Sequence, residues 1–362
     1  MQNISMDELL SKAIDKRASD LHITVGRPPV IRVHGELEDL DGYEPLDSES
    51  VKHLLYPILT QQQQESFEKN RRLDLGSDRG ELGRVRVNMF VQKSVMAAAF
   101  RIIPSKIPSL DELGLPSILA DFAMLPSGFV LVTGPTGSGK SSTLASMIDI
   151  INSRRKCHII TIEDPIEYLH KHKSSMIAQR EVGSDTLKFH DALKDALRQD
   201  PDVILVGEIR DPESMSMALT GAETGHLVLS TLHTIDTPQS IERMIDLFES
   251  GQQQQIRTQL SGVLRAVVSQ QLPRRADGSG RIAALEIMVA TSAIKNLIRK
   301  GETSQIYTNI QTGKQYGMQT MNQTLKDMVS KKLITEEVAF VHSPNLEELR
   351  RDLGSNVNGK KY

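Results

Sequence analysis

Residues 134–141 read Gly-Pro-Thr-Gly-Ser-Gly-Lys-Ser, which matches the phosphate-binding pattern G-x-x-x-x-G-K-[ST] at every fixed position. The apolar run 129–132 precedes this stretch, and the helix-forming run 142–148 follows it. Strand, glycine-rich turn and helix, in that order, form the setting in which the pattern cradles phosphate. The competing explanation is a chance glycine turn before a helix, and the match of both flanks argues against it.

The residue types in this loop suit a nucleoside triphosphate and Mg²⁺. Glycines let backbone N–H groups close on phosphate oxygens at the positive end of a helix. The ammonium of Lys140 reaches the outer phosphates, and the hydroxyl of Ser141 is a Mg²⁺ ligand. The residues expected to bind nucleotide are Gly134, Pro135, Thr136, Gly137, Ser138, Gly139, Lys140, Ser141 and Ser142.

Composition narrows the class of protein. The chain has 362 residues, enough for two or three domains. Its net charge is −3, so the protein as a whole lacks the positive electrostatic potential that would attract nucleic acid. Its one cysteine, Cys157, excludes an internal disulfide and is expected in a buried strand. We see no secretory signal pattern and no apolar stretch of bilayer length, so we expect a cytosolic protein that reaches a membrane through a partner.

The hydrophobic pattern divides the chain in two. Residues 1–103 predict a small α+β domain, with a helix capped by Ser5, a helical stretch over 47–70, and strands near 21–25, 31–33, 84–91 and 95–103. Prolines mark a linker over 104–118. Residues 119–350 alternate strands with helices such as 186–199, which predicts a mainly parallel sheet covered by helices. The strands are expected at 129–133, 158–162, 203–207, 227–231 and 282–289, and a disordered tail at 351–362.

Acidic residues follow two of these strands. Glu163, Asp164 and Glu167 come after the run 159–162, and Glu208 comes after the run 203–207. Parallel sheets bind ligands at the carboxyl ends of their strands, and phosphoryl transfer needs carboxylates near Mg²⁺ and the attacking water. A solvated acidic turn is the alternative for either group.

Two histidines and three arginines complete the candidates. His226 and His233 bracket the strand expected at 227–231, where they either sense the γ-phosphate or satisfy structural hydrogen bonds; they are too few to argue for zinc. Arg84 and Arg86 share one face of a strand, and Arg101 lies on the next strand. The alternative for these arginines is a solvated sheet face.

In this order, the motifs closely resemble the PilT family of type IV pilus retraction ATPases, within the RecA-like secretion ATPases. The resemblance covers roughly residues 5–335. Beyond the phosphate loop, it is carried by the stretches 18–22, 161–168, 200–211, 225–234, 293–300 and 317–323. In the stretch 293–300, Lys295 and Lys300 stand where the retraction motif Ala-Ile-Arg-Asn-Leu-Ile-Arg-Glu has Arg and Glu. That stretch also fits the core face of an ordinary helix.

The resemblance implies an α/β fold, with a RecA-like P-loop NTPase core and an N-terminal PAS-like α+β domain. It also implies a homohexamer that binds ATP and Mg²⁺ between its two domains. Glu163 would polarise the attacking water, and Ser141 and Glu208 would hold Mg²⁺, partly through water. His226 and His233 would support the γ-phosphate region. The implied arginine fingers are Arg84, Arg86 and Arg101.

The resemblance further implies a cytoplasmic motor at the inner face of the cytoplasmic membrane, at the pilus base. Its partner would be an inner-membrane pilus platform protein, with no nucleic acid and no direct membrane insertion. Two alternatives remain, an assembly or secretion ATPase of the same superfamily and a nucleotide-binding accessory subunit.

Overall fold

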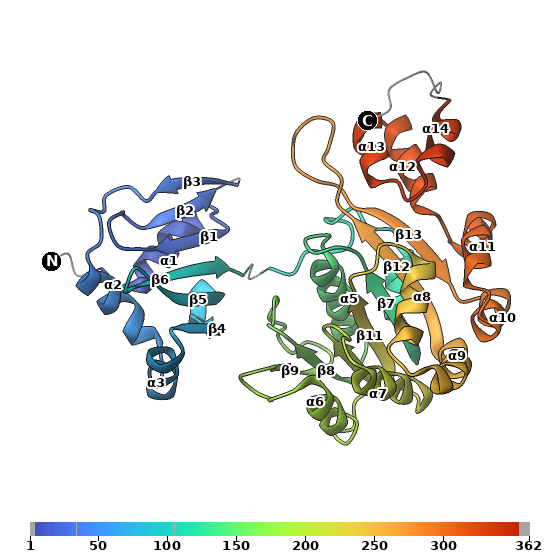
Figure 1. The fold of residues 1–362 in the computed structure, drawn as a ribbon, viewed down its shortest axis with the longest axis horizontal. Coiled ribbons are helices and arrows are strands. Elements are labelled where there is room, and N and C mark those ends of the chain that lie inside the picture. The colour runs from blue at the N-terminus through green and yellow to red at the C-terminus, as the bar shows by residue number, and fades with distance from the viewer. Residues whose placement is uncertain (1–3, 34, 104–105, 355–362) are drawn as a thin grey trace. The chain divides into compact units, whose positions relative to one another are not determined.

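The computed structural model describes residues 4–33, 35–103 and 106–354, and the chain forms two compact units (Figure 1). The first unit comprises residues 1–106 together with Pro165–Leu169. The second unit comprises residues 107–164 and 170–362. Each unit has its own sheet, and the buried apolar side chains of the first unit form a cluster separate from those of the second unit.

The first unit is built on an antiparallel sheet, which has six strands among its described residues. Their order is β3-β2-β1-β6-β5-β4, with bounds β1 Asp20–Ile23, β2 Val30–Val33, β3 Glu36–Asp39, β4 Arg72–Asp78, β5 Arg84–Gln92 and β6 Val95–Ile102. In β5 the apolar Val85, Val87 and Met89 are fully buried, while Arg84, Arg86 and Asn88 between them are not. This alternation is the expected signature of a sheet with one covered face. The helices of this unit are α1 Met6–Asp15, α2 Ser48–Leu55 and α3 Gln61–Asn70.

The stretch 47–70, predicted to be helical, is helical over most of its length and is divided into two helices. The structure has α2 and α3, separated by a 3₁₀ turn over Tyr56–Ile58. Pro57 lies in this turn, and its ring and missing N–H are incompatible with a continuing helix. A capping box between Thr60 and Gln63 then starts α3. The strands β3 and β4 were not predicted, because their many charged or exposed residues do not give the alternation of apolar and polar residues that marks a strand.

The second unit contains a mainly parallel sheet in the order β13-β12-β7-β11-β10-β8-β9. Within this sheet, β12 and β13 are the only antiparallel pair among the described residues. The predicted α/β class with a RecA-like core is confirmed. The strand bounds are β7 Gly128–Thr133, β8 His158–Glu163, β9 Met176–Glu181, β10 Val203–Val206, β11 Leu227–Leu232, β12 Leu264–Gln271 and β13 Ala284–Val289.

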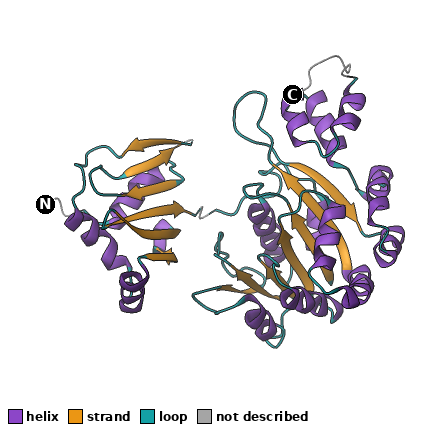
Figure 2. Cartoon of the chain, in the orientation of Figure 1, coloured by secondary structure: helices purple, strands orange, loops and turns teal. Residues whose placement is uncertain are grey.

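Helices cover both faces of this sheet (Figure 2). In β7, Phe129 and Leu131 join one apolar cluster, while Val130 and Val132 join the cluster on the other face. Burial on both faces explains why this strand is continuously apolar. The helices are α4 Ile118–Ala123, α5 Lys140–Arg154, α6 Phe189–Ala196, α7 Pro212–Glu223, α8 Thr237–Asp246, α9 Ser250–Val263, α10 Ser292–Lys300, α11 Ile306–Thr312, α12 Met321–Ser330, α13 Glu336–His342 and α14 Leu346–Leu353.

Several sequence predictions differ from the structure in this unit. The strands β9 and β12 were missed, and the helix predicted over 186–199 is the shorter α6. Helix α14 runs to Leu353, so the predicted tail at 351–362 begins inside a helix, and its residues 355–362 lie outside the described part of the chain. Cys157 precedes β8 instead of lying in it, and it is only partly buried beside the Ser175 hydroxyl at 3.2 Å.

One buried carboxylate joins two helices of the second unit. Glu286 in β13 is 1% exposed, and its Oε1 accepts a hydrogen bond of 2.9 Å from the N–H of Thr237, the first residue of α8. Its Oε2 accepts a longer hydrogen bond, of 3.5 Å, from the N–H of Met321, the first residue of α12. Burial raises the pKa of Glu286, against the opposing effect of the hydrogen bond from Thr237. Both helix starts therefore depend on one side chain for a buried acceptor.

We predict that Glu286→Ala destabilises the protein by about 2–4 kcal/mol, because two buried N–H groups at helix starts lose their acceptor. Denaturant unfolding followed by circular dichroism measures this change. The control is Glu223→Ala at the exposed end of α7, which should change stability by less than about 0.5 kcal/mol. Equal effects of the two substitutions would show that Glu286 does not support the helix starts.

Candidate functional site

The loop 134–139 connects β7 to α5 and places a glycine at the N-cap of that helix. Gly134, Gly137 and Gly139 have φ values of 142°, 77° and 87°, which other residues rarely adopt. The N-cap of α5 is Gly139, and no side chain caps it. The N-cap residue itself therefore offers no side-chain oxygen to the first helical turn, which favours an anion at this position.

Lys140, the first residue of α5, folds back over the loop. Its Nζ donates to the carbonyl oxygens of Gly134 at 2.7 Å and Pro135 at 3.1 Å. Arg281 donates to the carbonyl of Gly137 at 3.4 Å. Two cationic side chains thus meet the same loop, and this positive charge suits a polyphosphate.

The sheet order brings the predicted acidic residues to the edge that carries this loop. β11 lies between β7 and β10, and β8 lies beyond β10, all parallel. Glu163 ends β8, Glu208 follows β10, and His233 follows β11. Because parallel strands end at the same edge, these three residues and the phosphate loop occupy one side of the sheet.

Glu163 is held in place by its neighbours. Its Oε1 accepts hydrogen bonds from the hydroxyl of Thr161 at 2.7 Å and from the side-chain amide of Gln179 at 3.3 Å. Gly207 passes close to it, since a Cβ on Gly207 would lie 3.3 Å from the Cα of Glu163. The carboxylate therefore has a defined orientation, which a group that positions water needs.

Glu208 lies between a cation and a histidine. Its Oε2 is 2.8 Å from Nη2 of Arg210 and 3.3 Å from Nε2 of His233. Partial burial alone would raise the pKa of Glu208, but the hydrogen bond from Arg210 and the nearby His233 outweigh it, and the net effect lowers that pKa. Glu208 is therefore an ionised carboxylate at neutral pH, as a role near Mg²⁺ requires.

The two predicted histidines lie at opposite edges of the sheet. His233 follows β11 and contacts Glu208, whereas His226 precedes β11. The Nδ1 of His226 is 2.8 Å from the carbonyl of Gly221 and 3.1 Å from the hydroxyl of Thr224, in the turn after α7. The structure brings His233 to the edge of the phosphate loop and does not bring His226 there. A strand's two ends lie far apart, so bracketing residues cannot share one site.

The three predicted arginine fingers lie in the first unit. Arg86 and Arg101 are directly opposite one another in the pairing of β5 with β6. Arg101 is 3.1 Å from Asp20, and Arg86 is 3.4 Å from Asp74. Arg84 faces the same side of β5 as Arg86, because successive residues alternate. The carboxylates of this sheet face thus offset the repulsion between neighbouring arginines.

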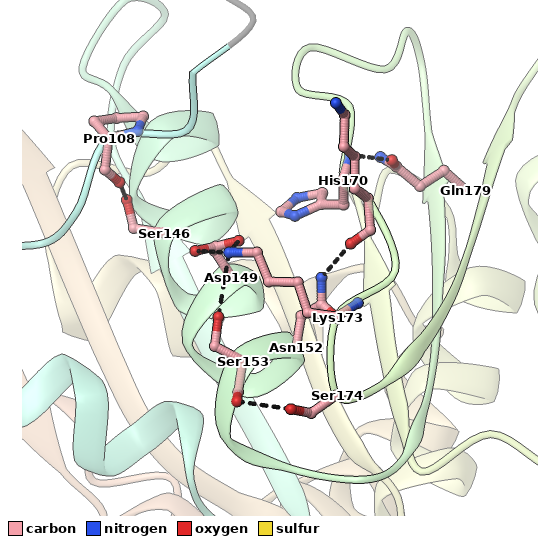
Figure 3. Close-up of polar contacts among 10 residues, drawn as sticks. Pro108, Ser146, Asp149, Asn152, Ser153, His170, Lys173, Ser174 and Gln179 are labelled. Carbon is pink, nitrogen blue, oxygen red and sulfur yellow. Dashed lines mark hydrogen bonds and ion pairs between the residues drawn. The ribbon is translucent and has the colours of Figure 1, made fainter.

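The loop 171–174, which follows the acidic residues 163–167, is held against α5 by an ion pair and hydrogen bonds (Figure 3). Lys173 forms an ion pair of 2.6 Å with Asp149 of α5, and the side-chain amide of Asn152 donates to the carbonyl of Lys171 at 2.7 Å. The hydroxyl of Ser174 donates to the carbonyl of Ser153 at 3.0 Å. Residues 171–174 therefore follow α5 along its surface.

Gln179 connects this loop to Glu163. Its amide oxygen accepts from the backbone N–H of His170 at 2.7 Å, and its amide nitrogen donates to Glu163. The imidazole of His170 is mostly buried, and burial lowers its pKa to about 4; Asp149 raises this pKa by a smaller amount, and Lys173 lowers it further. Gln179 was not predicted from sequence, because β9 itself was missed.

The site suits Mg²⁺ only together with a phosphate ligand. Among the described residues, no group of three or more His, Cys, Asp or Glu side chains could hold a metal ion. Mg²⁺ commonly takes one or two protein oxygens and completes its shell with phosphate oxygens and water. The hydroxyl of Ser141 in the first turn of α5 and the carboxylate of Glu208 fit that donor set.

Comparison with known proteins gives concordant matches over nearly the whole chain. The model of the family described as "Type II/IV secretion system protein" matches residues 2–350. The chain is 46% identical to the type IV pilus retraction ATPase PilT of Pseudomonas aeruginosa, covering 93% of this chain and 97% of that protein. It is 40% identical to the type IV pilus ATPase PilU of the same organism, covering 96% and 91%.

A solved structure agrees with these matches. The crystal structure of the pilus retraction motor PilT with bound ADP superimposes with a TM-score of 0.91 at 45% identity, covering 96% of this chain and all of that chain. In the described part of the present chain, no helix has the length and apolar character required to cross a membrane.

The burial of His170 predicts a pH dependence of stability. Because its pKa is about 4 when folded and near 6.5 when unfolded, only the unfolded state gains a proton as the pH falls between these values. The free energy of unfolding should therefore keep its full value above pH 6.5 and decrease by about 3 kcal/mol as the pH falls toward 4. Unfolding curves from pH 7 to pH 4 measure it.

His170→Phe should flatten this part of the pH profile. His190→Phe, on the partly exposed surface of α6, is the matched control and should keep the wild-type profile. A His170→Phe profile that runs parallel to the wild type across the range would rule out this role for His170.

Proposed function

The chain belongs to the type II/IV secretion system protein family, and from this premise we propose that it is an ATP-hydrolysing motor that drives retraction of a type IV pilus. The observation that carries the proposal is the 46% identity, over nearly all of both chains, with a pilus retraction ATPase. The phosphate loop and the two carboxylates at one sheet edge support the same chemistry.

Nucleotide binding is assigned to residues 134–142. The N–H groups of the loop and of the first turn of α5 would donate to the β-phosphate, and Lys140 would exchange its carbonyl partners for phosphate oxygens. Ser141 and Glu208 would hold Mg²⁺, the latter partly through water. Mg²⁺, when bound, neutralises phosphate charge and so favours attack on the γ-phosphate.

The water-positioning role is assigned to Glu163. Its carboxylate is oriented by Thr161 and Gln179, so it can accept a proton from an attacking water with little reorganisation. His233 would sense the γ-phosphate through Glu208, which it contacts. His226 was expected to share that role, and its place at the opposite sheet edge gives no support for it.

The first unit would supply positive charge to the transition state. We assign this role to Arg84, Arg86 and Arg101, whose guanidinium groups offer planar, bidentate donors to phosphate. Exchange of Asp20 or Asp74 for phosphate as the arginine partner would make hydrolysis depend on closure of the PAS-like domain, residues 1–103, onto the ATPase domain, residues 119–350. A homohexameric ring would present these groups repeatedly.

The motor would act in the cytoplasm, at the inner face of the cytoplasmic membrane beneath the pilus. Its mechanical partner would be the inner-membrane platform protein of the pilus machine. Lys295 and Lys300 in α10 would affect this coupling, since they stand where the retraction motif has Arg and Glu. Lys295 has a lowered pKa from burial and from the nearby Arg265.

We predict that Glu163→Gln retains ATP binding and loses at least about 100-fold in turnover, because an amide accepts no proton from water. A steady-state ATPase assay with a fluorescent nucleotide-binding assay separates the two effects. Cells that carry only this variant should show no pilus retraction. Glu213→Gln, in the exposed first turn of α7, is the control and should hydrolyse and retract normally. Normal turnover by Glu163→Gln would remove Glu163 from the catalytic role.

We predict that Arg101→Ala lowers turnover by about 100-fold without lowering the thermal stability, because its 66% exposed side chain contributes charge and little packing. Arg32→Ala is the matched control, since Arg32 also contacts Asp20, at 3.8 Å, and has no assigned catalytic role. Light scattering should find the same assembly for both variants. Turnover reduced equally by both substitutions would assign the effect to Asp20 and its sheet face.

A further inference from the structure

Gln270 lies in β12, the strand beside the one that leads into the phosphate loop, and it belongs to none of the motifs of the sequence. It is 3% exposed, so its amide must find hydrogen-bond partners inside the protein. A buried glutamine beside a ligand loop calls for an explanation, because glutamine is seldom fully buried.

The side chain of Gln270 bridges the loop and the helix that follows it. Its Nε2 donates to the carbonyl of Ser138 at 2.8 Å, and its Oε1 accepts from the hydroxyl of Thr143 at 2.7 Å. Ser138 lies in the phosphate loop, and Thr143 lies in the first turn of α5 with no exposed surface. One amide thus fixes the loop relative to the helix start.

The glycines at both ends of the loop also pack against Gln270. A Cβ on Gly134 would lie 2.2 Å from the backbone oxygen of Gln270, and a Cβ on Gly139 would lie 2.8 Å from its Nε2. Neither distance is compatible with a real side chain. The loop therefore follows β12 closely at its entrance and at its exit.

The bond to Ser138 also sets the direction of the next amide. In a trans peptide the C=O and the following N–H point in opposite directions. Holding the carbonyl of Ser138 toward Gln270 therefore directs the N–H of Gly139 away from β12. A flip of the peptide bond between Ser138 and Gly139 would place a carbonyl oxygen at the position where an anion requires an N–H group.

We propose that Gln270 is a positioning residue for nucleotide binding, which holds the phosphate loop in its anion-receptive conformation through Ser138 and Thr143. This inference rests on the proposed function, since it assumes that loop 134–141 binds the phosphates of a nucleotide. Gln270 acts on the ligand through the loop, not by direct contact.

The test compares two adjacent glutamines of β12. Gln270→Met keeps the length of the side chain and removes both hydrogen bonds. Gln271→Met is the matched control, because the amide of Gln271 bonds instead to His342 of α13, donating to its carbonyl at 3.1 Å and contacting its Nδ1 at 2.6 Å. Calorimetric titration with ADP, thermal melting without nucleotide, and the KM and kcat for ATP are measured on the full chain.

We expect Gln270→Met to weaken ADP binding and raise KM about tenfold, as the loss of two hydrogen bonds implies. Gln271→Met should leave both unchanged. A purely structural role for Gln270 would lower the melting temperature but leave ADP binding by the folded protein at the wild-type value, and that result would overturn the proposal.

Two further variants keep the test decisive if Gln270→Met does not fold. Thr143→Val removes one end of the bridge and should weaken ADP binding about threefold to tenfold, whereas Thr143→Ser keeps the hydroxyl and should restore it. Wild-type affinity in Thr143→Val would overturn the bridge. Failure of the wild-type chain to bind ADP would instead refute the proposed function, so the two failures are distinguishable.

Discussion

The close approach of two backbones is the constraint on which the second unit depends. The phosphate loop leaves β7 so near to β12 that no side chain fits at Gly134, and the neighbouring strand defines the wall against which the loop folds. Position 134 requires glycine for two reasons: a side chain would collide with β12, and the φ of 142° is one that other residues rarely adopt. The shape of the loop is therefore a property of the whole sheet edge, because β12 is held in turn by β7 and β13.

The charged side chains assigned to nucleotide binding and hydrolysis in the two units already have partners within the protein. Lys140 bonds to loop carbonyls, Glu208 to Arg210 and His233, and Arg101 in the first unit to Asp20. On the proposed function, phosphate oxygens would take the place of the loop carbonyls at Lys140 and of Asp20 at Arg101, and Mg²⁺ would take the place of the cationic partners at Glu208. This arrangement keeps the cost of desolvating the site low before and after binding.

Much of the site could be predicted because it depends on local pattern. The loop 134–141 and the acids after strands β8 and β10 each follow from a short run of residues and the rule for parallel strands. What escaped prediction depends on contacts between distant segments. Gln179 and Gln270 lie in strands that the periodicity did not reveal, and β12 continues directly from helix α9, so no turn separates the two. The same strand-end rule, applied to both histidines, would have separated His226 from His233.

Glu286 gives the second unit a property beyond stability. Helix α8 begins four residues after His233, and α12 belongs to the helical region near the end of the chain; both start on the same buried carboxylate. The two helices are therefore connected through one side chain. A displacement of α8 beside the nucleotide-binding edge would move the Glu286 carboxylate, and this carboxylate would in turn act on the start of α12.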